Sequence, residues 1–224
     1  MMASSFFRKA IHAQVAGNDQ HGAGLMEDLR ATAEPSAATM IDHIIWNVES
    51  MAFPVSPEEA EVLASVLKLP RVTVTRPSQQ NLLAMGMVAY DCHRNCAVYA
   101  ESDPDGSTKH VWGWIIHGSD LILHSVVERG GLWRCLTPQH IPVPPHFTFI
   151  PDMTIEWLEN ADGSREPFRN GARLPDALRK YPEDHIRMRD RFRELVDSGV
   201  SVFNARSIVE ATLGAEFSSK PGIC

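Results

Sequence analysis

The first clear hydrophobic pattern in this chain has helical spacing and follows a helix-start signal. Ser56 is a favoured N-cap residue, Pro57 suits the first helical position, and Glu59 completes a capping box. Four apolar residues then recur at positions that share one helix face, namely Val62, Leu63, Val66 and Leu67. Pro70 cannot continue a helix, so the pattern predicts a helix that ends before it.

Shorter runs with strand-like alternation follow. Gly118-Ser119-Asp120 and Arg129-Gly130-Gly131 separate three of them and have the composition of tight turns. These runs are rich in β-branched and aromatic residues and are too short for helices, so they predict strands. The predicted strands span residues 71–75, 111–116, 121–128, 132–136, 147–150 and 154–158.

Three further helices are expected. Asp91 is a suitable N-cap for a helix over residues 92–101, which the turn residues 103–106 end. Two more are predicted near the C-terminus, over residues 183–198 and 204–213. The segment 82–89 is apolar and is helical or irregular.

This order of elements predicts an α+β fold, in which the helix beginning at Cys92 packs on an antiparallel sheet. We expect a mobile N-terminal arm at residues 1–40, because this stretch has no sustained periodicity. The α+β core then spans residues 41–175, and the C-terminal helices of residues 176–224 pack on it.

Composition excludes several classes of protein. The chain has 224 residues and a net charge of −7, which argues against a nucleic-acid or anionic-membrane partner. It has no apolar run of about 18 residues, as a membrane span needs, and no apolar core of a secretory signal at its start. The four cysteines, at positions 92, 96, 135 and 224, form no regular disulfide framework, so a cytoplasmic location is expected.

Cys92 is the candidate nucleophile. At the first turn of a helix, its sulfur faces unpaired backbone N–H groups and the positive end of the helix dipole. We therefore expect a lowered thiol pKa, and the same N–H groups could bind an oxyanion. Asn95 lies one turn later on the same side and could hold the helix start against the sheet.

His124 is the preferred base because it lies in the middle of a predicted strand. His93 points about 100° away from Cys92 around the helix and is a poor base for that thiol. The other histidines near this region have the character of surface or loop residues: His110, His117, His140 and His146.

The register of the second hairpin decides which residue faces His124. If Gly130-Gly131 forms the turn, His124 lies opposite Thr137; if Arg129-Gly130 does, it lies opposite Cys135. Thr137 is slightly preferred, because Gly-Gly suits a type I′ turn better.

The motifs of residues 90–152 resemble the transglutaminase-like and papain-like cysteine superfamily, in which a helix-borne Cys is followed by a strand-borne His and then by an Asp or Asn. They are also similar to uncharacterised bacterial proteins with a Cys-His-x-Asn helix start. The matching segments are Cys92-His93-Arg94-Asn95, Gly113-Trp114, His124-Ser125-Val126, Cys135-Leu136-Thr137-Pro138 and Phe149-Ile150-Pro151-Asp152. Cys135 stands where the resemblance places Asp, and Asp152 is an alternative carboxylate.

The leading functional interpretation is a thiol-dependent hydrolase or acyl transferase that needs no cofactor and acts on a peptide, a protein or a small amide. Trp112 and Trp114 share one strand face and could wall a substrate groove. One alternative is a zinc-binding protein that uses soft ligands from the set Cys92, His93, Cys96, His110 and His124. Another is a non-catalytic descendant of the same fold that binds a peptide or partner.

Overall fold

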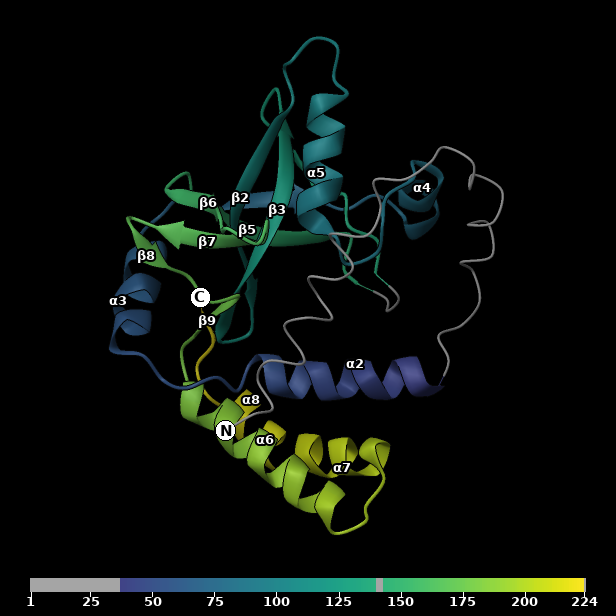
Figure 1. Cartoon of the computed structure of the whole chain (residues 1–224), viewed down its shortest axis with the longest axis vertical. Coiled ribbons are helices and arrows are strands. Elements are labelled where there is room, and N and C mark those ends of the chain that lie inside the picture. Colours follow the sequence, from purple (N-terminus) through teal and green to yellow (C-terminus); the bar gives the residue numbers. More distant parts are fainter. Residues whose placement is uncertain (1–36, 140–142, 224) are drawn as a thin grey trace.

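The structure, a computed structural model, describes residues 37–139 and 143–223. In these residues the fold is mixed α+β, with strands in one half and a layer of helices in the other (Figure 1). The helices are α2 (Ala37–Ser50), α3 (Pro57–Val66), α4 (Gln79–Ala84), α5 (Cys92–Glu101), α6 (Pro182–Asp197), α7 (Val202–Val209), the π-helix η2 (Glu210–Gly214) and α8 (Ala215–Ser218). The strands are β1 (Val72–Thr75), β2 (Lys109–His117), β3 (Asp120–Arg129), β4 (Leu132–Arg134), β5 (His146–Pro151), β6 (Ile155–Glu159), β7 (Arg165–Arg169), β8 (Ala172–Arg173) and β9 (Ala177–Arg179).

Five of the strands close into a ring in the order β2, β5, β1, β4, β3 and back to β2. Neighbours in this ring are antiparallel except β1 and β4, which run parallel and meet at Thr75 and Arg134. The Cys135 N–H also donates to the Thr75 carbonyl at 2.9 Å, which extends this contact. The predicted antiparallel sheet is therefore a small barrel, to whose strand β3 the short strand β9 is added.

The barrel has separate apolar groups inside and outside. Strand residues alternate between the two surfaces, so each strand contributes to both. The inner cluster contains Val74, Val111, Val126, Cys135 and Phe149. The outer cluster joins Trp114, Leu121, Leu123 and Ile150 of the barrel to Leu63 and Val66 of α3 and to Ile155, Leu174 and Leu178.

Strands β2 and β5 approach each other closely at Gly113. A Cβ atom there would lie 2.2 Å from the Ile150 carbonyl oxygen and 2.6 Å from the Phe149 ring. Only glycine permits this contact, which brings β5 against β2.

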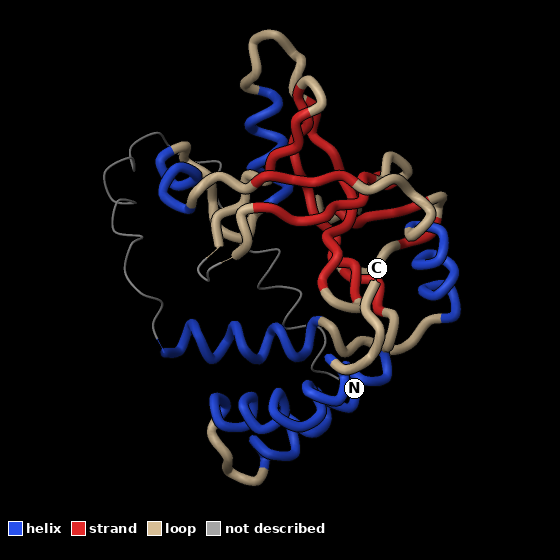
Figure 2. Tube along the Cα trace, turned by 180° about the vertical axis from the view of Figure 1, so that it is seen from behind, coloured by secondary structure: helices blue, strands red, loops and turns tan. Residues whose placement is uncertain are grey.

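Helix α5 packs along β3 and touches β2, and α4 lies beside it. The three-stranded sheet β6–β7–β8 forms a second, smaller layer. Helices α2, α6 and α7 form their own layer around Ile44, Phe192, Leu195, Ala205 and Val209. Figure 2 shows this helical layer from behind, below the crossing strands.

Several predicted elements are confirmed. The helix over residues 92–101 has these bounds, and the Asp91 carboxylate accepts a hydrogen bond from the Arg94 N–H at its start. The second hairpin turns at Gly130-Gly131, with φ angles of 57° and 83°, so Arg129 pairs with Leu132.

Other expectations failed or cannot be compared. Helix α2 begins inside the predicted arm of residues 1–40, and residues 1–36 lie outside the described part of the chain. The sequence analysis also missed β7, β8 and β9, because two- to five-residue strands carry too little periodicity to detect.

The predicted capping box at α3 is wrong in its side-chain contacts. Ser56 is the N-cap residue, but its hydroxyl bonds to Glu58. Glu59 turns inward, where it is 5% exposed and pairs with Arg179 of β9 at 2.8 Å. A buried guanidinium left without a carboxylate would be costly, so this pairing outweighs the local cap.

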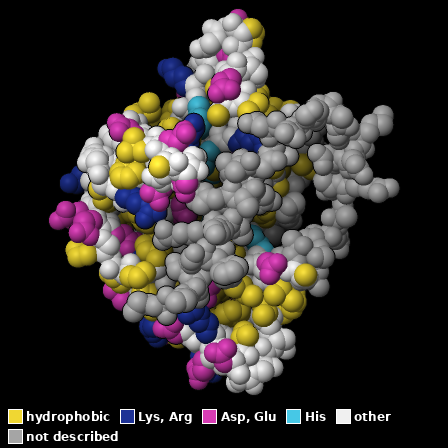
Figure 3. Space-filling view, in the orientation of Figure 1, with side chains coloured by type: hydrophobic (Ala, Val, Ile, Leu, Met, Phe, Trp, Pro, Cys, Tyr) yellow, Lys and Arg dark blue, Asp and Glu magenta, His cyan; other side chains and the backbone are white. Residues whose placement is uncertain are grey.

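In the part of the chain that the structure describes, no helix is long and apolar enough to cross a membrane. Acidic and basic side chains of the described residues are intermixed on the face drawn in Figure 3.

Removing one partner of the Glu59–Arg179 pair should destabilise the protein strongly. Glu59→Gln leaves the buried Arg179 guanidinium without its counter-charge, and we expect a loss of about 3–5 kcal/mol. Urea denaturation followed by circular dichroism measures this loss. The matched control is Glu159→Gln, which breaks the exposed pair with Arg165 and should cost at most about 1 kcal/mol. Equal costs for the two variants would contradict a stabilising role of the buried pair.

Candidate functional site

Cys92 is the first residue of α5 and lies against an edge of β3. The backbone of Ser125 hydrogen-bonds to its thiol, so the sulfur sits beside the strand that also carries His124. The residue before the N-cap, Tyr90, has a φ of 60°, a left-handed conformation that is costly for a bulky side chain. The helix start is therefore held in a constrained geometry.

The Cys92 thiol does not have the lowered pKa that its position at a helix start predicts. Burial raises the pKa of this thiol to about 12, and the neighbouring Cys135 and Asp91 raise it further, against the lowering effect of the Ser125 N–H. The expectation was wrong because it counted the helix dipole and omitted the loss of water around the sulfur. At neutral pH Cys92 is a thiol.

Three free cysteines gather around this point. Cys92 is partly exposed, whereas Cys96 and Cys135 are buried. Burial is also the main reason why the pKa of Cys96 is raised, and Cys92 and Cys135 add to it. Cys135 thus disfavours the ionisation of Cys92, and both of them disfavour that of Cys96.

His124 projects into the barrel. Its Nε2 lies 3.3 Å from the Cys135 sulfur, and its ring meets the Phe147 and Phe149 rings edge-on, with centroids 6.1 and 6.5 Å apart. Burial, together with the positive charges that His93 and Arg76 can carry, lowers its pKa to about 3. His124 is therefore a neutral imidazole, and among the described residues no hydrogen bond joins it to Cys92.

The second hairpin has the Gly130-Gly131 turn, whose register predicts Thr137 opposite His124. The residue that contacts the His124 ring is nevertheless Cys135. The reason is that β4 leaves β3 after Arg134, where the next N–H bonds to β1, so the strand no longer runs opposite His124. The Thr137 hydroxyl is buried and has no hydrogen-bond partner among the described residues.

Asn95 fixes the start of α5. Its side-chain amide accepts from the Val88 N–H at 2.9 Å and donates to the carbonyls of Val88 and Leu136 at 2.8 and 3.0 Å. It thereby joins α5 to the segments before the helix and after β4, and it is 4% exposed. These contacts give Asn95 the role of holding the helix against the barrel.

A second polar cluster lies next to Cys92, and the sequence analysis missed it. The Ser125 hydroxyl is 2.6 Å from Nδ1 of His93 and 2.8 Å from Nε2 of His110. A hydroxyl has one proton, so one imidazole accepts it while the other donates its N–H to the oxygen. Burial lowers the pKa of His93 to about 3, assisted by His110, and the pKa of His110 to about 4.

Aromatic rings enclose this cluster. The His93 ring is tilted against Trp112 and meets Trp157 edge-on, with ring centroids 4.7 Å apart in both cases, and the His110 ring centroid lies 3.9 Å from that of Trp112. The signal that could have revealed the cluster is the first hairpin. Its Gly118-Ser119 turn pairs Trp112 with Ser125, so the register alone brings His110 and Trp112 to the Ser125 hydroxyl.

Two of the predicted binding residues belong to the core. Trp114 is fully buried in the outer cluster and donates to Asp152 at 3.3 Å, so it does not wall a groove. Asp152 also pairs with Arg169 at 2.8 Å and accepts from Thr154. Burial by itself would raise the pKa of Asp152, but these hydrogen bonds lower it. Asp152 is thus a structural anion bound to its own partners.

The residues of the zinc alternative do not converge. His93 and His110 bond to Ser125, whereas His124 bonds to Cys135 inside the barrel. In the described ranges, no group of three or more His, Cys, Asp or Glu side chains could hold a metal ion.

Comparisons with known proteins give no further guide to this site. No protein-family model, no curated protein and no solved structure matches the chain.

The raised pKa of Cys92 should make this thiol slow to alkylate in the folded protein. Iodoacetamide reacts with thiolates, so at pH 8 we expect Cys92 to react about a hundredfold more slowly in the folded than in the unfolded chain. Peptide mass spectrometry at timed intervals, with and without guanidinium, gives both rates for the same residue. Similar rates in the two states would show that burial does not protect the sulfur.

The buried neutral histidines should make stability depend on pH. Their pKa values lie well below the value of about 6.5 in an unfolded chain, so the unfolded state binds more protons as the pH falls below about 6.5. Stability should therefore drop between pH 7 and pH 5, by about 2 kcal/mol for each fully buried histidine. Urea midpoints at both pH values measure the drop.

A pair of variants assigns this effect. His93→Gln should flatten the dependence of stability on pH, because it removes one buried group that must be charged on unfolding in acid. The exposed His117→Gln is the control. An unchanged slope in His93→Gln would contradict the depressed pKa of His93.

Proposed function

We propose that this protein is a thiol-dependent hydrolase or acyl transferase acting on an amide, with Cys92 as the nucleophile and His124 as the base. The observation that carries the proposal is the hydrogen bond between the Ser125 backbone and the Cys92 sulfur. It brings a thiol at the start of a helix against the strand that carries His124. This arrangement is similar to the core of papain-like and transglutaminase-like proteins.

The proposed reaction begins with neutral groups. The Cys92 sulfur attacks the amide carbonyl carbon while its proton passes to the neutral His124 imidazole. The imidazolium then gives this proton to the leaving nitrogen, so an amine departs and a thioester remains. Water, or another nucleophile, cleaves the thioester and regenerates the thiol.

Two features support this division of roles. Cys135 contacts Nε2 of His124; in the tautomer in which Nε2 donates its N–H to that sulfur, Nδ1 carries the lone pair that a base needs. The Arg94 N–H bonds to the Asp91 carboxylate, so the N–H groups of Cys92 and His93 are the ones proposed to stabilise the oxyanion of the tetrahedral intermediate. Because the proton leaves during the attack, a resting pKa of about 12 for Cys92 is compatible with this chemistry.

The substrate class that fits is broad. A peptide, a protein glutamine or a small amide each offers the required carbonyl. The papain-like core, the Cys-His pair and a cytoplasmic location are parts of this same proposal.

A second candidate function is a non-catalytic descendant of the fold that binds a peptide or partner. It is favoured by Cys135, which stands where the resemblance places Asp. A sulfur stabilises an imidazolium less well than a carboxylate does. The raised pKa of Cys92 favours it too.

Acyl transfer can be separated from plain thiol reactivity with two reagents. Iodoacetamide reports the thiolate alone, whereas a base that accepts the thiol proton and an oxyanion site accelerate the reaction of Cys92 with p-nitrophenyl acetate. We expect a stoichiometric burst of p-nitrophenol and an acetyl group on Cys92, formed faster than in the unfolded chain. Stopped-flow absorbance and peptide mass spectrometry measure the two.

Variants then test each role. Cys92→Ala should abolish the burst, His124→Gln should slow it by about 10²–10⁴-fold, and Cys224→Ser should leave it unchanged. A burst that persists in Cys92→Ala would overturn the proposal. If Cys92 is not acetylated and Cys135→Asp, checked for folding by circular dichroism, gains no reactivity, the non-catalytic candidate is supported instead.

A further inference from the structure

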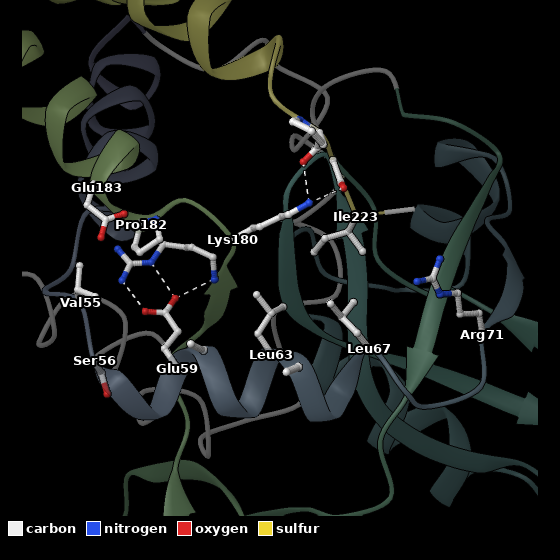
Figure 4. A pocket seen from close by; sticks show the side chains of 15 residues that line it. Val55, Ser56, Glu59, Leu63, Leu67, Arg71, Lys180, Pro182, Glu183 and Ile223 are labelled. Carbon is white, nitrogen blue, oxygen red and sulfur yellow. Dashed lines mark hydrogen bonds and ion pairs between the residues drawn. The ribbon is translucent and has the colours of Figure 1, made fainter.

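A hollow in the structure lies away from Cys92. It is a groove of about 740 Å³ between α3 on one side and the β9–α6 junction with the C-terminal segment Pro221–Ile223 on the other (Figure 4). Its volume is in the range of about 300–1,000 Å³ that is typical of small-molecule sites.

The sequence of α3 explains why there is a groove. Ala60 and Ala64 are one turn apart and have side chains too small to fill the space in front of the helix. Leu63 and Leu67 line the same face, and Ile223 approaches them from the C-terminal segment (Figure 4). The walls are therefore mostly apolar.

The C-terminal segment is held in place as one wall. Lys180 Nζ donates to the carbonyls of Pro221 and Gly222, both at 3.0 Å, and the Ile223 N–H donates to the Gly118 carbonyl at 2.8 Å. Gly222 lies so close to Gly118 that a Cβ there would be 2.9 Å from the Gly118 oxygen. The groove is thus a fixed feature of the fold.

The charges along the groove are asymmetric. At one end, Arg71 lies beyond Leu67 and makes no hydrogen bond or ion pair with another described residue (Figure 4). At the other end, Arg179 is neutralised by Glu59, and Glu183 adds a negative charge. Lys180 also lines the groove, but its Nζ is engaged by the Pro221 and Gly222 carbonyls. An anion is therefore favoured at the Arg71 end over the Glu183 end.

We propose that this groove binds an amphiphilic monocarboxylate, such as a medium-length fatty acid, with its carboxylate on Arg71 and its acyl chain along Leu67, Leu63 and Ala60. The guanidinium offers paired N–H donors that match a carboxylate. The acyl chain replaces water on the apolar walls, and the chain end points toward the exposed Val55. This ligand site is independent of the proposed chemistry at Cys92.

Calorimetric titration with octanoate, decanoate and dodecanoate, below their micelle concentrations, tests the proposal. We expect one saturable site whose Kd falls about tenfold for each two added methylenes, until the chain outgrows the groove. Decanol lacks the carboxylate and should bind about tenfold more weakly than decanoate. Arg71→Ala should weaken decanoate binding to the same extent and leave decanol unaffected.

Two variants on α3 locate the site. Ala64→Phe fills the groove and should abolish binding, whereas Glu61→Phe places the same ring on an exposed position outside the groove and should preserve it. Both are compared with the parent chain by urea denaturation, so that loss of binding is not loss of folding. Cys92→Ala should bind decanoate normally, whatever its effect on acyl transfer. Absence of saturable binding, or equal binding by the two Phe variants, would overturn the proposal.

Discussion

The candidate site depends on a gap in the hydrogen bonding of β3. This strand pairs with β9 over Asp120–Ile122 and with β4 over Val127–Arg129, on the edge opposite β2. The N–H groups between these two pairings still need acceptors, because an unpaired buried backbone group is costly. The Leu123 N–H donates to the Asp176 carbonyl, and the Ser125 N–H donates to the Cys92 sulfur. The first turn of α5 thus completes an edge that no strand covers.

This arrangement gives the thiol two opposing influences. The helix start and the Ser125 N–H favour a thiolate, whereas burial and the neighbouring Cys135 and Asp91 favour the thiol. The effect of burial on the thiol pKa is the largest of these, so the position that makes Cys92 a candidate nucleophile also keeps its thiol protonated. His124 shows the same effect in the opposite direction, since burial keeps its imidazole neutral. Both groups are therefore uncharged at neutral pH, which avoids the cost of burying a charge.

The rest of the fold is tied to the barrel by buried charges. Arg179 on β9 bonds to Glu59 of α3 and to the Met51 and Phe53 carbonyls, and its guanidinium lies 3.4 Å over the Phe53 ring. These contacts fix the chain between α2 and α3 and hold α3 against β9. The groove along α3 exists because this helix is held at one end by an ion pair and is lined by alanines where the space opens.

By itself, the sequence determined the elements whose signals are local. The Asp91 cap, the helix from Cys92, the Gly130-Gly131 turn and the strand around His124 all follow from neighbouring residues. Only the tertiary structure decided what lies next to them. Closure of the barrel by β1 draws β4 away from β3, which makes Cys135 the partner of His124 in place of Thr137. Glu59 pairs with Arg179 instead of capping α3, and burial raises the pKa of Cys92. Both outcomes depend on burial, which is a property of the packed fold and of no short stretch of chain.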